Sequence, residues 1–136
     1  MSNHEKKSKI RSSSIPTPKL ERVENFVERY ANNARFESTV FDLKVVFGEV
    51  DISTGQEVIK QHTGVTLPWQ VIKLAIYYLQ VNLMAHEAQN GKVLIPRSQL
   101  PPPFPPPTAE EQGKVLRAKE LFEAINRYRE EFLKTL

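Results

Sequence analysis

Apolar and polar residues alternate through the middle of the chain in a pattern that predicts three consecutive strands. Residues 34–40 alternate with the period of two that a half-buried strand requires. Residues 41–52 alternate in the same way until Gly48, where the apolar set changes face, which indicates a β-bulge. The turn residues of 53–56 lead into 57–67, whose β-branched content is typical of a third strand.

The segment from Pro68 to Gly91 has the residue spacing of a helix, roughly 34 Å long at 1.5 Å per residue. One narrow stripe holds Gln70, Lys73, Tyr77, Gln80, Met84 and Glu87, whereas most of the apolar residues spread over roughly 200° of the circumference, about twice an ordinary buried stripe. One sheet face cannot cover that arc, and the polar stripe argues against a membrane span. We expect Thr66 to cap this helix and Gly91 to end it.

Two further segments carry apolar residues at helical spacing. Residues 20–30 place five of them on one helical face. The prolines of 101–108 favour an extended polyproline II spacer, or a ligand for an aromatic-lined groove. Thr108 and Glu111 then form a capping box that begins an amphipathic helix running to the end of the chain. This helix could cover the long helix of its own subunit, cross to another subunit, or dock on a different protein.

These elements predict an α+β fold, in which a three-stranded antiparallel sheet is followed by a long helix packed on it, with a C-terminal amphipathic helix after a proline-rich spacer. At 136 residues the chain has room for one domain with a modest core. The expected organisation is a disordered basic arm (1–20), a strand-strand-strand-helix domain (21–98), a proline-rich spacer (99–107) and a C-terminal helix (108–136).

Several short motifs occur in an order found in a known family. They are YANN at 30–33, FG at 47–48, VTLP at 65–68 and LQVNL at 79–83, followed by a glycine. In these features residues 30–96 resemble a small bacterial family catalogued as domain of unknown function 3467. That family usually enters its helix at Thr-Pro, whereas Leu67 intervenes here. The resemblance implies a compact strand-strand-strand-helix unit and brings no catalytic residues with it. The plan is also similar to the subunit of SecB-type export chaperones, at the level of fold alone.

The net charge of +3 is concentrated at the N-terminus. Residues 1–22 hold six Lys or Arg and two acids, whereas residues 23–136 hold thirteen and fourteen. A basic arm attracts phosphate, so nucleic-acid binding is an alternative function. Its candidate residues are Lys6, Lys7, Lys9 and Arg11. The chain has no cysteine and no apolar stretch behind its basic N-terminus, so we expect a cytoplasmic protein.

The sequence contains no catalytic, metal-binding or phosphate-binding motif. Asn82 and His86 lie four residues apart within the apolar arc of the long helix. They could form a binding or acid-base site, but a hydrogen-bonded pair that fixes the register against a partner helix is the favoured interpretation. We therefore expect no enzyme, no cofactor and no metal.

The sequence thus favours a non-enzymatic protein-interaction module that forms a homodimer or larger homo-oligomer and binds a further protein. A SecB-like chaperone or adaptor is a second alternative. The expected oligomer interface on the long helix consists of Val71, Ala75, Leu79, Asn82 and His86. The expected partner-binding residues of the C-terminal helix are Val115, Ala118, Phe122, Ile125 and Phe132.

Overall fold

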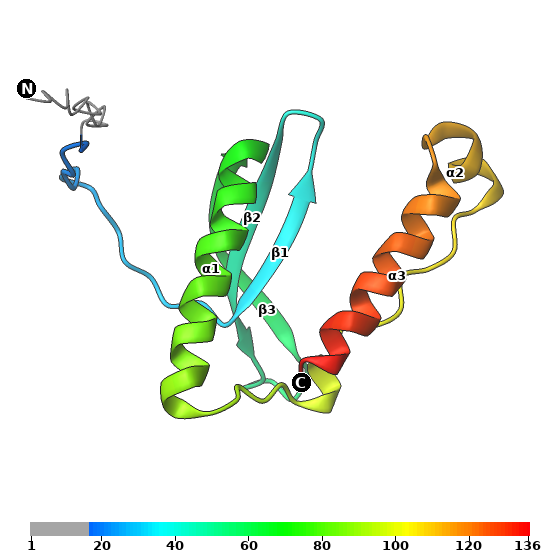
Figure 1. Ribbon diagram of the computed structural model, residues 1–136. Coiled ribbons are helices and arrows are strands. Elements are labelled where there is room, and N and C mark those ends of the chain that lie inside the picture. Colours follow the sequence, from blue (N-terminus) through cyan, green and yellow to red (C-terminus); the bar gives the residue numbers. More distant parts are fainter. Residues whose placement is uncertain (1–16) are drawn as a thin grey trace, which may run out of the picture. The chain divides into compact units, whose positions relative to one another are not determined.

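The computed structural model describes residues 17–136, and its first regular elements are the three strands (Figure 1). They are β1 (Asn33–Ser38), β2 (Asp42–Asp51) and β3 (Val58–Pro68). They form one antiparallel sheet in the order β1-β2-β3, so that β2 is central and the other two strands are edges. The three strands and their order along the chain confirm the prediction from alternation.

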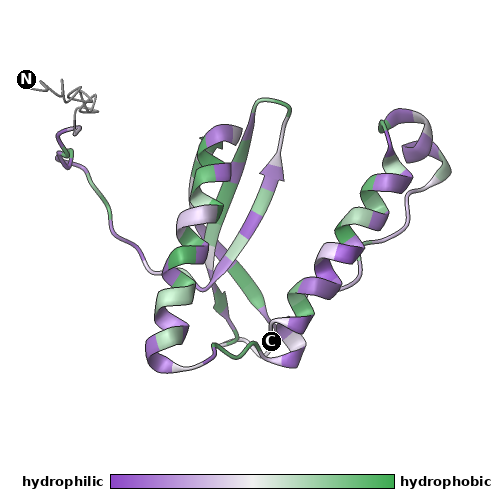
Figure 2. Ribbon diagram, viewed as in Figure 1, coloured by the Kyte–Doolittle hydropathy of each residue, from purple (hydrophilic) through white to green (hydrophobic). Residues whose placement is uncertain are grey.

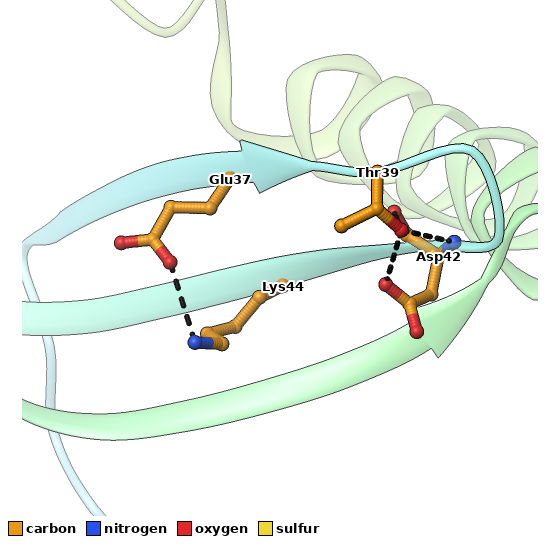
Figure 3. Close-up of polar contacts among 4 residues, drawn as sticks. All are labelled: Glu37, Thr39, Asp42 and Lys44. Carbon is orange, nitrogen blue, oxygen red and sulfur yellow. Dashed lines mark hydrogen bonds and ion pairs between the residues drawn. The ribbon is translucent and has the colours of Figure 1, made fainter.

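The turn between β1 and β2 is held by Thr39, whose backbone N–H donates to the Asp42 carbonyl at 2.9 Å. The Thr39 hydroxyl donates to the Asp42 carboxylate at 2.8 Å and accepts from the Asp42 backbone N–H at 3.1 Å (Figure 3). Two residues further along each strand, Glu37 and Lys44 form an ion pair at 3.3 Å. The side chains of this hairpin therefore define its register locally.

Gly48 lies at a point where the backbones of β2 and β3 approach closely. A Cβ added there would lie 2.6 Å from the Lys60 carbonyl oxygen and 3.0 Å from the Gln61 Cα. Both are backbone atoms, so no side-chain movement can make room. The glycine at which the apolar pattern changes face is therefore required by the packing of the sheet.

Residues 20–30, whose apolar side chains share one helical face, have no regular structure. Their turn is closed by a hydrogen bond from the Phe26 N–H to the Val23 carbonyl at 3.0 Å. An isolated helix this short is marginal in water, and these apolar residues are exposed rather than packed on a surface. The helical spacing of the apolar residues is therefore not sufficient to form a helix in the single chain.

The long helix α1 (Trp69–Asn90) follows β3 directly. The cap predicted at Thr66 is wrong: Thr66 belongs to β3, Pro68 precedes the helix, and no side chain caps it. The Trp69 indole N–H instead donates to the Thr39 carbonyl at 3.1 Å. The predicted end is confirmed, because Gly91 has φ 87° and its N–H donates to the Glu87 carbonyl at 3.0 Å.

The C-terminal part contains a short 3₁₀ turn, η1 (Arg97–Gln99), and two helices, α2 (Ala109–Lys114) and α3 (Ala118–Lys134). The Thr108 cap is confirmed, since its hydroxyl accepts from the Glu111 N–H at 3.2 Å. The expected single helix is broken after α2, where Arg117 adopts the left-handed conformation with φ 56° and ψ 37°.

The buried core of the described residues is very small. Val45 of β2, 8% exposed, is their only buried large apolar side chain. Figure 2 shows hydrophobic residues interspersed with hydrophilic ones along α1, although no residue of that helix is buried. A chain of this size ordinarily buries many such side chains, so most of the apolar surface that could form a core lies uncovered.

Candidate interaction surface

The most extensive apolar surface of the described chain lies on α1. Within this helix only Ile72, Ala75 and Glu87 are half-buried, and every other residue is exposed. The large apolar side chains run from 37% exposed at Val71 to 69% at Leu79. The exposed set is Trp69, Val71, Leu74, Ile76, Tyr77, Tyr78, Leu79, Val81, Leu83 and Met84.

The exposed apolar area of α1 is comparable to that of a protein interface. Aromatic side chains have 150–250 Å² each to bury and aliphatic ones somewhat less, so at these exposures α1 presents on the order of 1,000 Å². A standard interface buries about 800 Å² on each partner. The side chains spread over more than one face of the helix, so contacts on more than one side are needed to cover them.

The expected interface residues Val71, Ala75, Leu79, Asn82 and His86 all lie on α1, at steps of three and four residues. This spacing places them on one stripe of the helix. Ala75 is half-buried and the other four are exposed. Their role in association stays a prediction.

Asn82 and His86 each make their hydrogen bonds within their own helix. The Asn82 amide donates to the Tyr78 carbonyl at 2.7 Å. The Asn90 amide donates to the His86 carbonyl at 3.0 Å and lies 3.3 Å from His86 Nδ1. These are bonds between residues four apart, and none links Asn82 to His86.

His62, on β3, has a role that the sequence did not indicate. Its Nε2 lies 2.9 Å from the Tyr30 carbonyl and its Nδ1 lies 2.7 Å from the Thr63 hydroxyl. Because a carbonyl only accepts, Nε2 carries the hydrogen of this bond. His62 thereby attaches the segment before β1 to the sheet. The two residues are 32 positions apart, so local pattern could not reveal the contact.

A hollow of about 360 Å³ surrounds this attachment. Its lining is apolar apart from His62 and two other polar side chains, and consists of Val27, Arg29, Ala31, Phe47, His62 and Thr63. His62 bonds its neighbours rather than pointing into the hollow with a free ring nitrogen. The arrangement is that of a structural contact.

A charged pair joins β2 and β3 near the second turn of the sheet. Lys60 Nζ lies 2.8 Å from the Asp51 carboxylate, whose other oxygen accepts from the Ser53 backbone N–H at 2.9 Å. The hydrogen bond from Lys60, followed by that from Ser53, holds the pKa of Asp51 well below its usual range. The same pairing raises the pKa of Lys60.

The proline-rich segment lies against α3 and is not a free spacer. The Asn126 side chain forms hydrogen bonds with both backbone groups of Phe104. It accepts from the Phe104 N–H at 2.9 Å and donates to the Phe104 carbonyl at 3.2 Å. One turn further along α3, Arg129 Nε donates to the Pro101 carbonyl at 2.9 Å. We call residues 101–134 the proline-helix hairpin.

The apolar residues of α3 lie on the same side of the helix as these contacts. Phe122, Ile125 and Phe132 are half-buried. A hollow of about 270 Å³ is lined almost entirely by apolar atoms of Pro101, Pro102, Phe104, Ile125, Tyr128, Arg129 and Phe132. Of the other expected partner-binding residues, Val115 lies in the break between the two helices and Ala118 begins α3.

The sequence did contain a signal for the hairpin. Proline has no N–H, so a proline-rich run offers carbonyls that a ladder of backbone bonds cannot satisfy. Asn126 and Arg129 supply donors at a three-residue spacing on the apolar side of α3. Polar residues at that position in an apolar stripe indicate a neighbouring backbone.

Other expected sites can be placed only in part. Lys6, Lys7, Lys9 and Arg11 lie outside the described residues. Within residues 17–136 no cluster of three or more His, Asp or Glu side chains is arranged to hold a metal ion. None of the helices in this range combines the length and apolar character that a membrane crossing requires.

Together these features define an α+β protein with a three-stranded sheet, a long exposed apolar helix and a proline-helix hairpin. The chain belongs to the family described as protein of unknown function (DUF3467), whose model matches residues 1–95. The match begins earlier than the Tyr30 expected from the motifs, and it ends before the hairpin. No curated protein and no solved structure shows significant similarity to the chain.

Proposed function

We propose that this protein is a non-enzymatic, self-associating interaction module in which α1 forms the contact between copies. The observation that carries the proposal is the exposure of large apolar side chains on α1 from Trp69 to Met84. Surfaces of this extent on soluble proteins mark protein contacts. Covering this surface removes apolar area from water, which is the main favourable contribution to association.

The contacts that α3 makes with the proline-rich segment support the choice of α1, rather than α3, as the self-association surface. The apolar side of α3 already contacts the proline segment through Asn126 and Arg129. The hairpin still exposes Phe104, Leu121 and Tyr128, the last by 73%. In our proposal these residues bind a further protein, since aromatic side chains are preferred anchors of interfaces.

The test measures the absolute mass of the full chain by light scattering over a range of concentrations. We expect a dimer or larger assembly for the natural chain. Leu79→Glu places a charge within the α1 surface and should shift the mass to the monomer. Lys73→Glu changes a residue of the polar stripe in the same helix and should leave the mass unchanged. A natural chain that stays monomeric at all concentrations would refute self-association.

The same variant, tested also in an aggregation assay, separates the proposal from a SecB-like chaperone or adaptor. An exposed apolar helix also fits the binding of unfolded polypeptides. In that case the natural chain would suppress aggregation of an unfolding protein, and Leu79→Glu would abolish this activity without a change in mass. A self-associating module shows the change in mass instead.

A further inference from the structure

The segment Leu20–Tyr30 is the second large uncovered apolar surface of the described chain. It has no regular structure, yet it contains five large apolar residues, from 49% exposed at Phe26 to 91% at Leu20. At these exposures they present on the order of 700 Å². Docking of such a segment on an apolar surface lowers the free energy, because apolar area is removed from water.

One end of this segment is fixed to the sheet. The Tyr30 carbonyl accepts from His62, the Asn32 N–H donates to the Gly48 carbonyl at 3.0 Å, and the Asn32 side chain accepts from the Val50 N–H at 2.9 Å. Within residues 17–29 no backbone hydrogen bond reaches a strand, and the bond from the Phe26 N–H to the Val23 carbonyl lies within the segment. Hydrogen bonds therefore hold the segment at its C-terminal end only.

The apolar spacing of the segment is that of a helix which needs a partner surface. Leu20, Val23, Val27 and Tyr30 follow at steps of three and four residues. As a helix the segment would be roughly 16 Å long, or three turns. Peptides of this kind bind by placing residues at this spacing in an apolar groove or along a partner helix.

A stripe on α1 matches that requirement. Leu74, Tyr78 and Val81 follow at steps of four and three residues and are all exposed. At 3.6 residues per turn Leu74 and Val81 lie about 100° or more around the helix from the half-buried Ile72 and Ala75, whereas Tyr78 lies about 60° from Ala75. The stripe thus borders the part of α1 that its own chain partly covers, and Leu74 and Val81 lie away from it.

We propose that the Leu20–Tyr30 segment of one copy docks on the Leu74–Val81 stripe of α1 in a second copy. The proposal rests on the self-association proposed above and names the contact that completes it. In the single chain both surfaces are exposed, so a second copy is the occupant that covers both. A two-fold axis makes the exchange reciprocal and closes the assembly at a dimer. Each partner then contributes one segment and one stripe, whose combined exposed area is comparable to the roughly 800 Å² per partner of a standard interface.

The natural chain has no cysteine, so introduced cysteines are unique reporters. Val23→Cys and Leu74→Cys are made in separate full-length chains that carry different tags. The chains are mixed, allowed to exchange and treated with a short bis-maleimide. We expect a cross-linked species that carries both tags, in at least fivefold excess over the same mixture made with Lys73→Cys. Lys73 is adjacent in sequence but lies in the polar stripe of α1.

The mass of each mixture before cross-linking separates the two proposals. A dimer without selective cross-linking at residue 74 overturns segment exchange and leaves self-association intact. A monomer overturns both. A chain carrying both cysteines that links only within itself also overturns the exchange.

A second variant tests the energetic contribution of the segment. Val23→Glu should weaken dimer formation at least tenfold, because it buries a charge in the proposed contact. Asn25→Glu, a change on the polar side of the same segment, should leave the dissociation constant within twofold. Equal effects of the two substitutions would count against the docked segment.

Discussion

Gly48 is the residue at which the sheet is least tolerant of substitution. We predict that Gly48→Ala lowers the free energy of unfolding by about 2 kcal/mol, within the usual range for overpacking. The reason is the 2.6 Å distance from the new Cβ to the Lys60 carbonyl oxygen, which only a backbone shift can relieve. The change is measured as a shift of the urea midpoint at unchanged slope.

Gly64→Ala provides the matched control on the neighbouring strand. Its Cβ would meet only the Lys44 side chain, at 3.7 Å, which is an ordinary contact. The control should change the free energy of unfolding by less than about 0.5 kcal/mol. Similar losses for both variants would show that loss of glycine flexibility, and not the close approach at Gly48, controls the effect.

The Asp51–Lys60 pair gives the stability a defined pH dependence. The pKa of Asp51 is lower in the folded chain than in the unfolded chain. The pair therefore stabilises the fold above the unfolded pKa of about 4, and this stabilisation is lost as pH falls through the lowered pKa. The difference in stability between the natural chain and Asp51→Asn should shrink as the pH is lowered from 7 towards 2.

Denaturation at several pH values and two salt concentrations checks this prediction. High salt should reduce the difference at pH 7, because both side chains reach solvent. Glu49→Gln on the same strand removes one carboxylate and leaves the pair intact, so its difference from the natural chain should not follow this pattern. A constant difference for Asp51→Asn across the pH range would contradict the assignment.

Residue features that depend on near neighbours were predictable from sequence. Gly91 ends α1 and Thr108 caps α2, as their local patterns predict. Thr66 failed as a cap because β3 continues to Pro68, so pairing with β2 overrides the local preference. The bond between His62 and Tyr30 depends on a distant contact and has no local signature.

At the scale of elements, strong periodicity predicted the strands and α1, whereas marginal helices required knowledge of their surroundings. The Leu20–Tyr30 segment has helical spacing, but its large apolar side chains are exposed and it has no regular structure. The break between α2 and α3 falls at Arg117, a residue type without strong preference for the left-handed conformation. Nothing in the sequence pattern marked that position.

The proline-helix hairpin should depend on Asn126. We predict that Asn126→Ala lowers the stability of the hairpin by about 1–2 kcal/mol, because it removes both bonds to the Phe104 backbone. The free segment should show faster hydrogen exchange at the Phe104 amide. Arg127→Ala, one residue further and exposed, should leave this rate unchanged. An unchanged exchange rate of the Phe104 amide in Asn126→Ala would contradict the proposed role of the two Asn126–Phe104 hydrogen bonds.

For the whole molecule, the central fact is the scarcity of buried side chains relative to the apolar content. The sequence already showed more apolar circumference on the long helix than one sheet can cover, and the structure places those residues in solvent. What covers an apolar residue could not be identified from sequence, because such a residue has the same pattern whether its neighbour lies in the same chain or another. The family match extends over both proposed contact elements, the Leu20–Tyr30 segment and α1.

A protein whose main core forms between copies should melt at a temperature that depends on its concentration. If unfolding accompanies dissociation of a dimer, each tenfold rise in concentration adds about 1.4 kcal/mol to the stability of the folded assembly. For a chain of this size the melting midpoint should then rise by a few °C per tenfold step. Circular dichroism at three concentrations, each tenfold apart, measures this shift. Leu79→Glu should melt lower and without concentration dependence. A natural chain with a constant midpoint would indicate that its stability resides within the single chain.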